Sequence, residues 1–488
     1  MPSPLFKRTL GNAGALTAGA VTEALLQFVF LLLASRQLGP EDYGFYEYLV
    51  GIVTFLVAVV QWGLPVVAVR ELAQTPERLD VVFGAMFRIS GILALVCFVG
   101  GVAASVFGST TPDRSMAIWL LFLYLLFLPF HFAAIFDAFK LSRWDALGRV
   151  VGRTASVLVL IILWQIRGHL TLMDAALCAS LNLAVNVAVA WWIAGRVQVK
   201  PHLGAAFDLS VSEISKEAQR LAKRAAPIMW ANLMTTVYSF SQPVLVKWYS
   251  TDLQTGWFGL ANRLLFPMLM VRGLLSRLAL PILSEAADDP AKFEWRLGRI
   301  LITLALFFMP VTALAIPAIE ILVVPVFGPA YAESVRPLQV LFGHLFFTGV
   351  GSIFGTALFS LGYQKTYTWS ITIACALNLV AASLLIPRWG AMGASFSVAA
   401  AELTTVAITL PALLSVVRIK VWGRMARIML ISLAGFVIYY VLTRGMAVHA
   451  IAAFAAELLS LTVLLWVSGE ISGEQLRGIL DLVRRRRE

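Results

Sequence analysis

Three arginines in one apolar stretch are the residues best suited to bind a charged ligand. Arg263, Arg272 and Arg277 lie within residues 256–281, which are long enough to cross a bilayer as a helix. A charged side chain in hydrocarbon costs at least about 2.5 kcal/mol unless it faces protein, water or a ligand. A guanidinium keeps its charge at every working pH and binds phosphate oxygens through two parallel hydrogen bonds. We therefore predict an anion-binding site, with local pairing or snorkelling as the alternative for each arginine.

Carboxyl and imidazole groups in other apolar stretches form a second set of candidates. Glu23 and Glu402 lie near the middle of their stretches, and His344 also lies within one. Such groups can exchange a proton or bind a cation, and they are candidates for coupling. The alternative is a carboxylate paired with a neighbouring helix, or a hydrogen-bonded packing histidine. Glu457 and His131 have the same character, with weaker support for a functional role.

Motifs of enzyme chemistry are missing from the sequence. It contains no Walker loop, DxD pair, H-E-x-x-H motif or nucleophile elbow, so ATP hydrolysis and glycosyl transfer lack the residues that they need. Cys97, Cys178 and Cys375 fall singly in apolar stretches, without the spacing of metal ligands. We expect no enzyme activity, metal site, cofactor or disulfide.

Apolar stretches of about twenty residues make up most of the chain. Hydrophobic residues account for 60% of the 488 residues and charged residues for only 13%, which is too little charge for a soluble surface. Backbone polar groups in hydrocarbon must be satisfied within the chain, so we predict an all-α polytopic membrane protein. We expect about fourteen transmembrane helices, at 14–36, 46–68, 84–107, 116–138, 150–166, 172–195, 225–247, 256–281, 301–327, 337–360, 367–386, 393–417, 427–443 and 448–467.

Lysine and arginine residues are distributed unevenly between the two sides of the membrane. When the N-terminus is placed in the cytoplasm, most of the 38 lysines and arginines fall on the cytoplasmic side, including the run Arg484–Arg487. This bias predicts that both termini are cytoplasmic. The net charge of +11 then follows from topology and anionic lipid headgroups, and we expect no nucleic-acid partner.

The spans divide into two halves that share sequence features. Gly44-Phe45-Tyr46, which opens the second span, matches Gly256-Trp257-Phe258, which opens the eighth, and both spans end in Leu-Pro. Two parallel six-helix lobes follow from such a repeat. We expect an N-lobe at 1–195, a cytoplasmic amphipathic linker at 196–224, a C-lobe at 225–417, an appended helix hairpin at 418–467 and a basic tail at 468–488.

Several motifs together resemble one family. They are LGPEDYG after the first span, ANRL and LPILSE around the eighth, VFGPAYAESVRPLQVL before the tenth and LIPRWGAMGASFS before the twelfth. In order and spacing they resemble the bacterial polysaccharide exporters, which are oligosaccharide-lipid flippases of the multidrug/oligosaccharidyl-lipid/polysaccharide superfamily and relatives of the lipid II flippases. The resemblance implies a MATE-like arrangement of two lobes around a central cavity that opens alternately to either side of the inner membrane.

The resemblance also implies roles for the candidate residues. Lipid II flippases carry an arginine at the position of Arg263, and the substrates of the family carry a phosphate or pyrophosphate that a guanidinium can bind. For Arg272 and Arg277, near the predicted cytoplasmic end, local pairing is the favoured interpretation. Lipid II flippases also have arginines in their first span, where this chain has Glu23. Lipid II itself is therefore not the expected substrate.

We thus expect a flippase that moves an undecaprenyl-linked oligosaccharide outward across the inner membrane. Its expected partners are that lipid-linked substrate, membrane lipids, a polysaccharide polymerase and glycosyltransferases. A drug or cation antiporter of the same superfamily is the nearest alternative, because the glutamates within spans suit cations. A membrane scaffold of a polysaccharide assembly complex is the alternative from another class.

Overall fold

The structure, a computed structural model, describes residues 4–107, 111–197, 199, 201, 211–445 and 449–469. Within these ranges the chain is helical and contains no strand. Eleven segments are long and apolar enough to cross a membrane. Two of them, Gly19–Gln74 and Gln364–Leu414, each contain two of the spans that the sequence predicted. The all-helical fold class is confirmed, and the number fourteen stays a prediction.

The chain forms two compact units, residues 1–259 (unit 1) and residues 260–488 (unit 2). The division falls inside a helix and differs from the predicted division, which put the linker at 196–224 between two lobes. The predicted lobes therefore stay a prediction. Unit 1 contains α1 (Pro4–Gln61), α2 (Leu64–Gln74), η1 (Pro76–Arg78), α3 (Leu79–Phe107), α4 (Pro112–Phe127), η2 (Leu128–Phe130), α5 (Ala133–Ala138), α6 (Ser142–Arg167), α7 (Leu172–Arg196), α9 (Val211–Tyr249) and the start of α10 (Asp252–Ser284).

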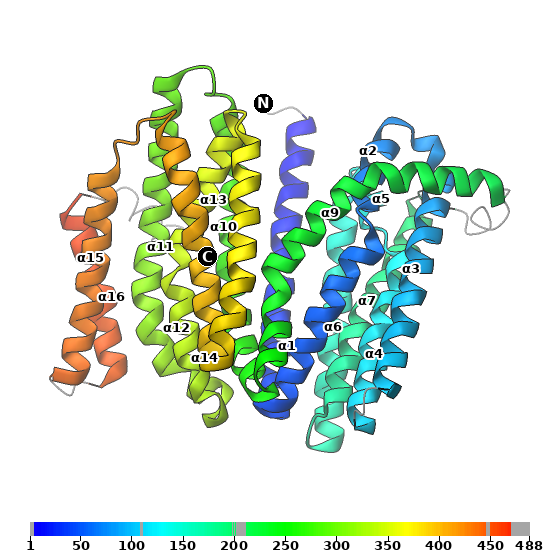
Figure 1. Ribbon diagram of the computed structural model, residues 1–488, viewed down its shortest axis with the longest axis horizontal. Helices are drawn as coiled ribbons and strands as arrows, with labels where there is room; N and C mark the ends of the chain where they lie inside the picture. Colours follow the sequence, from blue (N-terminus) through cyan, green and yellow to red (C-terminus); the bar gives the residue numbers. More distant parts are fainter. Residues whose placement is uncertain are drawn as a thin grey trace. The chain divides into compact units, whose positions relative to one another are not determined.

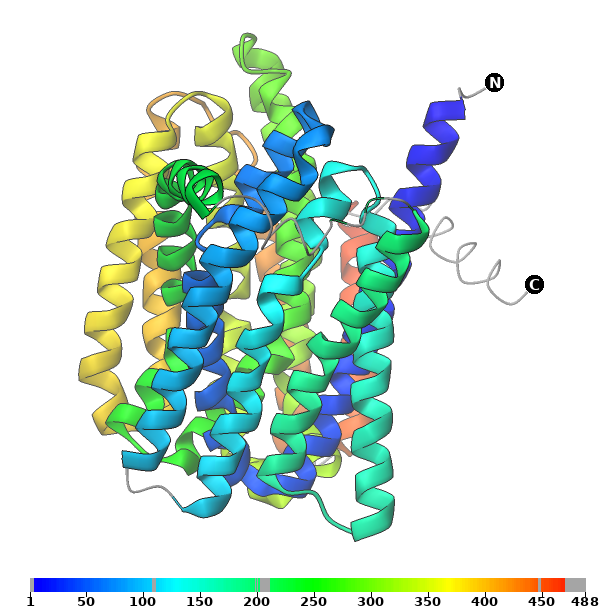
Figure 2. The same ribbon diagram turned by 90° about the vertical axis from the view of Figure 1, so that its right-hand side faces the viewer.

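Helix α1 holds the first two predicted spans and reverses direction between them (Figure 1). The reversal lies at Gly39, whose φ of 71° favours glycine, and Pro40 follows it. The second predicted span, 46–68, is interrupted at Trp62 and Gly63, both of which have positive φ. Helices α3, α4, α6 and α7 run alongside one another in unit 1 (Figure 2).

The fourth predicted span, 116–138, is not one helix. Helix α4 passes into the short η2, which contains Pro129, and α5 begins only after His131 and Phe132. The tenth predicted span is divided in a similar way in unit 2, because α12 (Val335–Gly343) ends at His344 and α13 (Leu345–Ser360) begins after it. Both breaks place a histidine where the helix is interrupted.

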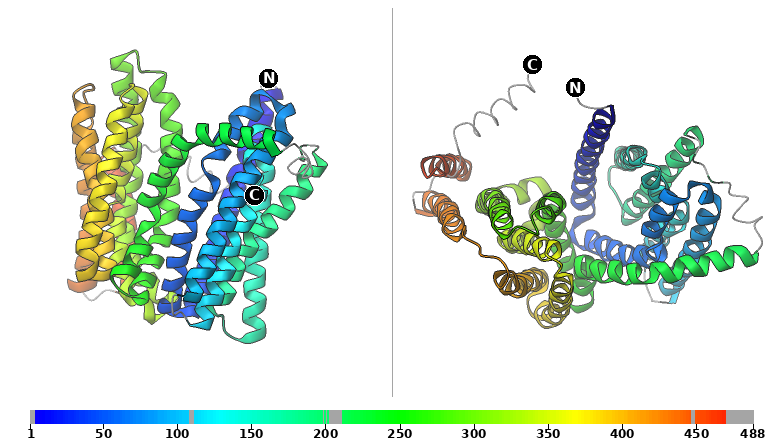
Figure 3. Two further views of the ribbon diagram at one scale, coloured as in Figure 1. Left: turned by 45° about the vertical axis from the view of Figure 1, so that its right-hand side comes forward. Right: turned by 90° about the horizontal axis from the view of Figure 1, so that it is seen from above.

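Helix α9 includes the second part of the predicted linker and the seventh predicted span in one continuous helix. It first runs across the ends of the unit 1 helices and then turns along them (Figure 3). The expected amphipathic pattern is present, since Leu221 and Ala225 are buried while Lys223 and Arg224 are exposed. The buried face packs into a core cluster with Leu64 of α2.

Helix α1 and the first turns of α10 cross closely within unit 1. A Cβ atom on Gly44 would collide with the carbonyl oxygen of Asp252, and one on Gly256 would collide with that of Pro40. Only glycine therefore fits at either position. These are the two glycines that the halves of the sequence share, so the repeated motif marks this helix crossing.

Unit 2 contains the rest of the chain. The helix α14 joins the eleventh and twelfth predicted spans across a kink at Gly390, where φ is 51°. The predicted C-terminal hairpin corresponds to α15 and α16, and the predicted basic tail lies outside the described residues from residue 470 onward. The elements are the remainder of α10, α11 (Pro290–Phe327), η3 (Pro329–Ser334), α12, α13, α14 (Gln364–Leu414), α15 (Trp422–Tyr440), the π-helical η4 (Val441–Gly445) and α16 (Ala450–Val467).

Candidate functional site

Two of the predicted site residues meet in unit 2. Arg272 of α10 lies opposite Glu402 of α14, with 3.6 Å between Arg272 Nη1 and Glu402 Oε1. Glu402 is buried and Arg272 is half-buried. An anion-binding candidate and a coupling candidate thus form one ion pair between two helices. This contact has the form of local pairing, the predicted alternative to anion binding by Arg272.

His344 lies close to the same ion pair. Its side chain is buried at the break between α12 and α13, and its Nδ1 lies 3.3 Å from the carbonyl oxygen of Val340. The positive charge of Arg272 acts on His344 and on the hydroxyl of Tyr367. Arg272 and Glu402 form an ion pair, and His344 lies in the same unit.

The other two predicted arginines lie on the same helix as Arg272. Arg263 is half-buried in α10, and Arg277 is exposed near the end of the same helix. Among the residues that the structure describes, no carboxylate pairs with Arg277. Arg263 remains the predicted phosphate ligand, because its role depends on a ligand that the structure does not contain.

Glu23 belongs to a polar chain in unit 1. Arg149 of α6 contacts Glu23 of α1, with 3.2 Å between Nε and Oε2. The same guanidinium, through Nη1, also bonds Oδ2 of Asp145, one turn earlier in α6. On the other side of Asp145 lies His131, with 3.8 Å between its Nε2 and Asp145 Oδ1. Four ionisable side chains thus form one chain of neighbours, in the order Glu23, Arg149, Asp145 and His131.

Asp145 and Arg149 were not predicted as site residues. The predicted fifth span begins at residue 150, whereas α6 begins at Ser142, so both side chains looked like charges of a loop. The signal that was present is their i,i+4 spacing, which places them on one face of a helix. Both residues belong to the helix, and Asp145 is buried.

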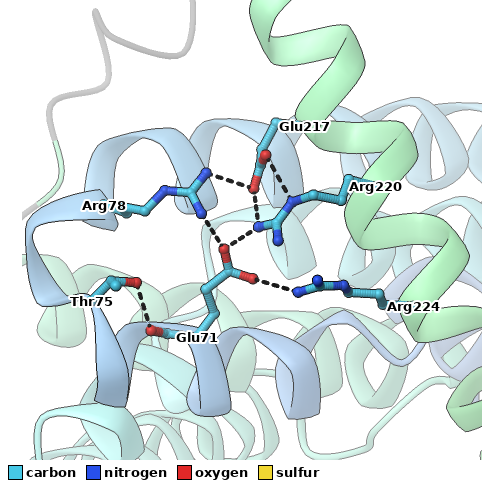
Figure 4. A network of polar contacts seen from close by, with 6 residues as sticks. All are labelled: Glu71, Thr75, Arg78, Glu217, Arg220 and Arg224. Atoms are coloured by element: carbon cyan, nitrogen blue, oxygen red, sulfur yellow. Dashed lines mark hydrogen bonds and ion pairs between the residues drawn. The ribbon is translucent and has the colours of Figure 1, made fainter.

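A second network fastens α9 to α2 (Figure 4). The Glu71 carboxylate of α2 accepts hydrogen bonds from Arg78 and Arg220, and Arg224 approaches it to 3.8 Å. Glu217 pairs with Arg220 and, at 3.1 Å, with Arg78. Burial opposes ionisation of Glu217, but the hydrogen bonds and charges of Arg220 and Arg78 outweigh it and lower the pKa of that carboxyl.

The described residues contain no group of three or more histidine, cysteine or carboxylate side chains that could hold a metal ion. The polar groups of the two units consist mainly of arginine–carboxylate pairs. Such pairs can exchange partners or bind an anionic ligand, but they do not offer a cation a free carboxylate cluster.

Comparison with known sequences identifies one family. A family model described as "Polysaccharide biosynthesis protein" matches residues 9–287, which is more than half of the chain. A comparison with curated protein sequences finds no significant match.

Comparison with solved structures identifies the fold. The lipid II flippase MurJ in an inward closed conformation matches with a TM-score of 0.69 and 15% identity, covering 92% of this chain and 97% of that chain. An inward-facing multidrug resistance MATE transporter of the MOP superfamily matches with a TM-score of 0.62 and 14% identity, covering 81% and 94%. A MATE transporter from Vibrio cholerae gives 0.52 and 15%, covering 84% and 96%. The fold is therefore the one that these transporters share.

Proposed function

Because the chain belongs to the polysaccharide biosynthesis protein family, we propose that it is a flippase for a lipid-linked oligosaccharide. The substrate is a sugar chain on an undecaprenyl-type phosphate or pyrophosphate, and it crosses the bacterial inner membrane by alternating access. The observation that carries the proposal is the family match over residues 9–287, together with a fold shared with a lipid II flippase over 92% of the chain.

The charges within the spans support an anionic substrate. Arg263 is the predicted ligand of the phosphate, because a guanidinium binds phosphate oxygens in a bidentate way. Glu23 and Glu402 are each paired with an arginine, so their negative charge is already compensated. This favours the flippase over the drug or cation antiporter, which needs carboxylates for a cationic ligand.

We also propose the orientation. Glu71, Arg78, Arg220 and Arg224 meet in one network, and the charge distribution assigned its three arginines to the cytoplasmic side. Arg114 and Lys247, assigned to the external side, both pair with Asp252. Residues assigned to one side thus meet one another, which supports the assignment of the helix ends to two sides; cytoplasmic termini rest on the positive-inside bias.

Loss of the protein should trap its substrate on the cytoplasmic leaflet. In cells without the protein, we expect lipid-linked oligosaccharide to accumulate while surface polysaccharide disappears, and the wild-type chain should restore both. Radiolabelled sugar in the lipid extract measures the accumulation. Normal surface polysaccharide without accumulation of any lipid-linked sugar would contradict the proposal. Loss of polysaccharide without accumulation would instead favour the scaffold.

A further inference from the structure

A cavity of about 210 Å³ lies inside unit 1 where the fourth predicted span is interrupted. Its wall includes three polar side chains, Gln61, Ser90 and His131, among apolar ones from α2, α3 and α5. Since one water molecule occupies about 30 Å³ of liquid, the cavity has room for several. The imidazole of His131 therefore borders a partly polar cavity that is large enough for water.

Asp145 has an unused hydrogen-bond acceptor beside that imidazole. Its Oδ2 bonds Arg149, but its Oδ1 is buried and has no hydrogen-bond partner among the described residues. His131 Nε2 lies 3.8 Å from this oxygen, which is too far for a hydrogen bond. A buried carboxylate oxygen without a donor is costly and needs an explanation. A protonated His131 that moved closer would supply the missing donor.

Opposing influences act on a proton at His131: burial of the imidazole and the charge of Arg149 oppose it, whereas the charges of Asp145 and Asp137 favour it. Asp145, Arg149 and Asp137 act on its imidazole, and Asp137 accepts a hydrogen bond of 2.6 Å from the Ser142 hydroxyl. Asp145 in turn senses Arg149, His131, Asp137 and Glu23. These groups comprise three carboxylates and one guanidinium, so a second positive charge on His131 would bring the group closer to balance.

We propose that His131 is the proton-binding residue of unit 1 and that its protonation shifts Arg149 from Asp145 toward Glu23. The Nε2 proton of the imidazolium donates to Asp145 Oδ1, and the negative charge of Asp145 is then shared between two cations. The bond from Arg149 Nη1 to Asp145 weakens, and the contact of Arg149 Nε with Glu23, now at 3.2 Å, strengthens. The cavity beside η2 would thereby control the contact between α1 and α6.

Protonation of His131 followed by the shift of Arg149 constitutes a relay. The relay does not rest on the proposed flippase function, whereas its link to transport does. If the relay couples to transport, protons that enter the cavity set how firmly α6 holds α1. Glu23 then acts as the receiving end of the relay, and His131 is the residue that exchanges the proton. This extends the predicted coupling role of Glu23 to a residue that borders a cavity.

The relay can be measured without substrate. The full-length protein in nanodiscs, with labelled histidine and arginine side chains, is titrated between about pH 5 and 8, where histidine commonly changes charge. We expect the His131 imidazole and the Arg149 Nε–H signal to change with one common midpoint. His131→Gln should abolish the change at Arg149. The matched control His169→Gln, an exposed histidine of unit 1, should leave it intact.

A second variant separates the relay from misfolding. Asp145→Asn keeps His131 but removes its charged acceptor, so His131 should still titrate while the Arg149 signal no longer follows it. The proposal is overturned if His131 keeps one protonation state throughout this range. It is also overturned if Arg149 responds to pH as before in His131→Gln. Because no substrate is present, these outcomes are independent of whether the protein flips a lipid-linked sugar.

Discussion

A carboxylate in a membrane-spanning helix needs a compensating charge, and Glu402 obtains part of this from Arg272. The carboxylate is buried, and the two side chains lie 3.6 Å apart on α14 and α10. Breaking such a pair is more costly than removing it, because the remaining charge stays buried without its partner. The pair therefore contributes to stability whether or not it also takes part in transport.

Replacing Arg272 alone should thus be more harmful than replacing both residues. We expect Arg272→Met to lower the free energy of unfolding by about 1–3 kcal/mol, because it leaves the Glu402 carboxylate undercompensated. Adding Glu402→Gln should recover part of this loss. Thermal unfolding of the purified variants measures both effects. Equal unfolding temperatures for the single and double variants would show that the pair does not hold α10 to α14.

At this scale the sequence located ionisable side chains within apolar stretches but could not give their partners, and their roles stay predictions. Arg272, Glu402, Glu23 and His344 were all selected because they are ionisable within apolar stretches. Their pairing depends on residues far apart in the chain, and neither periodicity nor composition contains that information. Asp145 was missed because its helix begins eight residues before the predicted span, in a stretch whose charges are typical of a loop.

At the scale of elements, the charged network on α9 decides which part of the protein this helix moves with. Glu71 contacts Arg78, Arg220 and Arg224, and it is nearly buried. The helix lies across the end of unit 1 (Figure 3), and its apolar face packs on α2. We infer that α9 up to its turn follows unit 1. The sequence predicted the amphipathic helix, but not that its apolar face covers protein.

Removing the central carboxylate should release α9 from α2. With paired spin labels at Gln74 and Gln219, both exposed, we expect Glu71→Gln to broaden the distance distribution, because the three arginines lose their shared acceptor. Glu77→Gln, an exposed carboxylate of η1, is the matched control and should leave the distribution narrow. An unchanged distribution in Glu71→Gln would mean that apolar packing alone holds α9.

Acid should weaken the same contact. The pKa of Glu217 is lowered in the folded protein. The ionised carboxylate therefore stabilises the contact between α9 and α2 fully above the ordinary pKa of 4.5, and this stabilisation is lost as the pH falls below that value. We expect the Gln74–Gln219 distance to broaden only in that acidic range. Broadening that begins near neutral pH would point to a different titrating group.

At the scale of the whole molecule, the sequence predicted the helical fold and the repeat. Apolar stretches of bilayer length are nearly sufficient to define membrane helices, and the family motifs identified the superfamily fold. The break near His131 has a signal in the sequence, Pro129, whereas the apolar pattern continues through the break at His344. The repeat motif had a structural cause that the sequence did not show, namely the close crossing at Gly44 and Gly256.

The charge distribution makes a prediction about the entire chain. Both termini and the segment at 196–224 should lie in the cytoplasm. Reporter fusions at Gly204 and at the C-terminus should be active only as cytoplasmic reporters. Periplasmic activity at either position would contradict the assignment of sides.

The most direct test of the central claim is translocation by the purified protein. In proteoliposomes that carry an undecaprenyl-pyrophosphate-linked labelled oligosaccharide, a membrane-impermeant enzyme measures the fraction of sugar on the outer leaflet over time. We predict that the wild-type chain moves the sugar between leaflets, that Arg263→Ala abolishes this movement and that Arg263→Lys restores only part of it, because an ammonium cannot reproduce the bidentate guanidinium contact. Folded wild-type protein that leaves every lipid-linked sugar tested on its original leaflet would contradict the account.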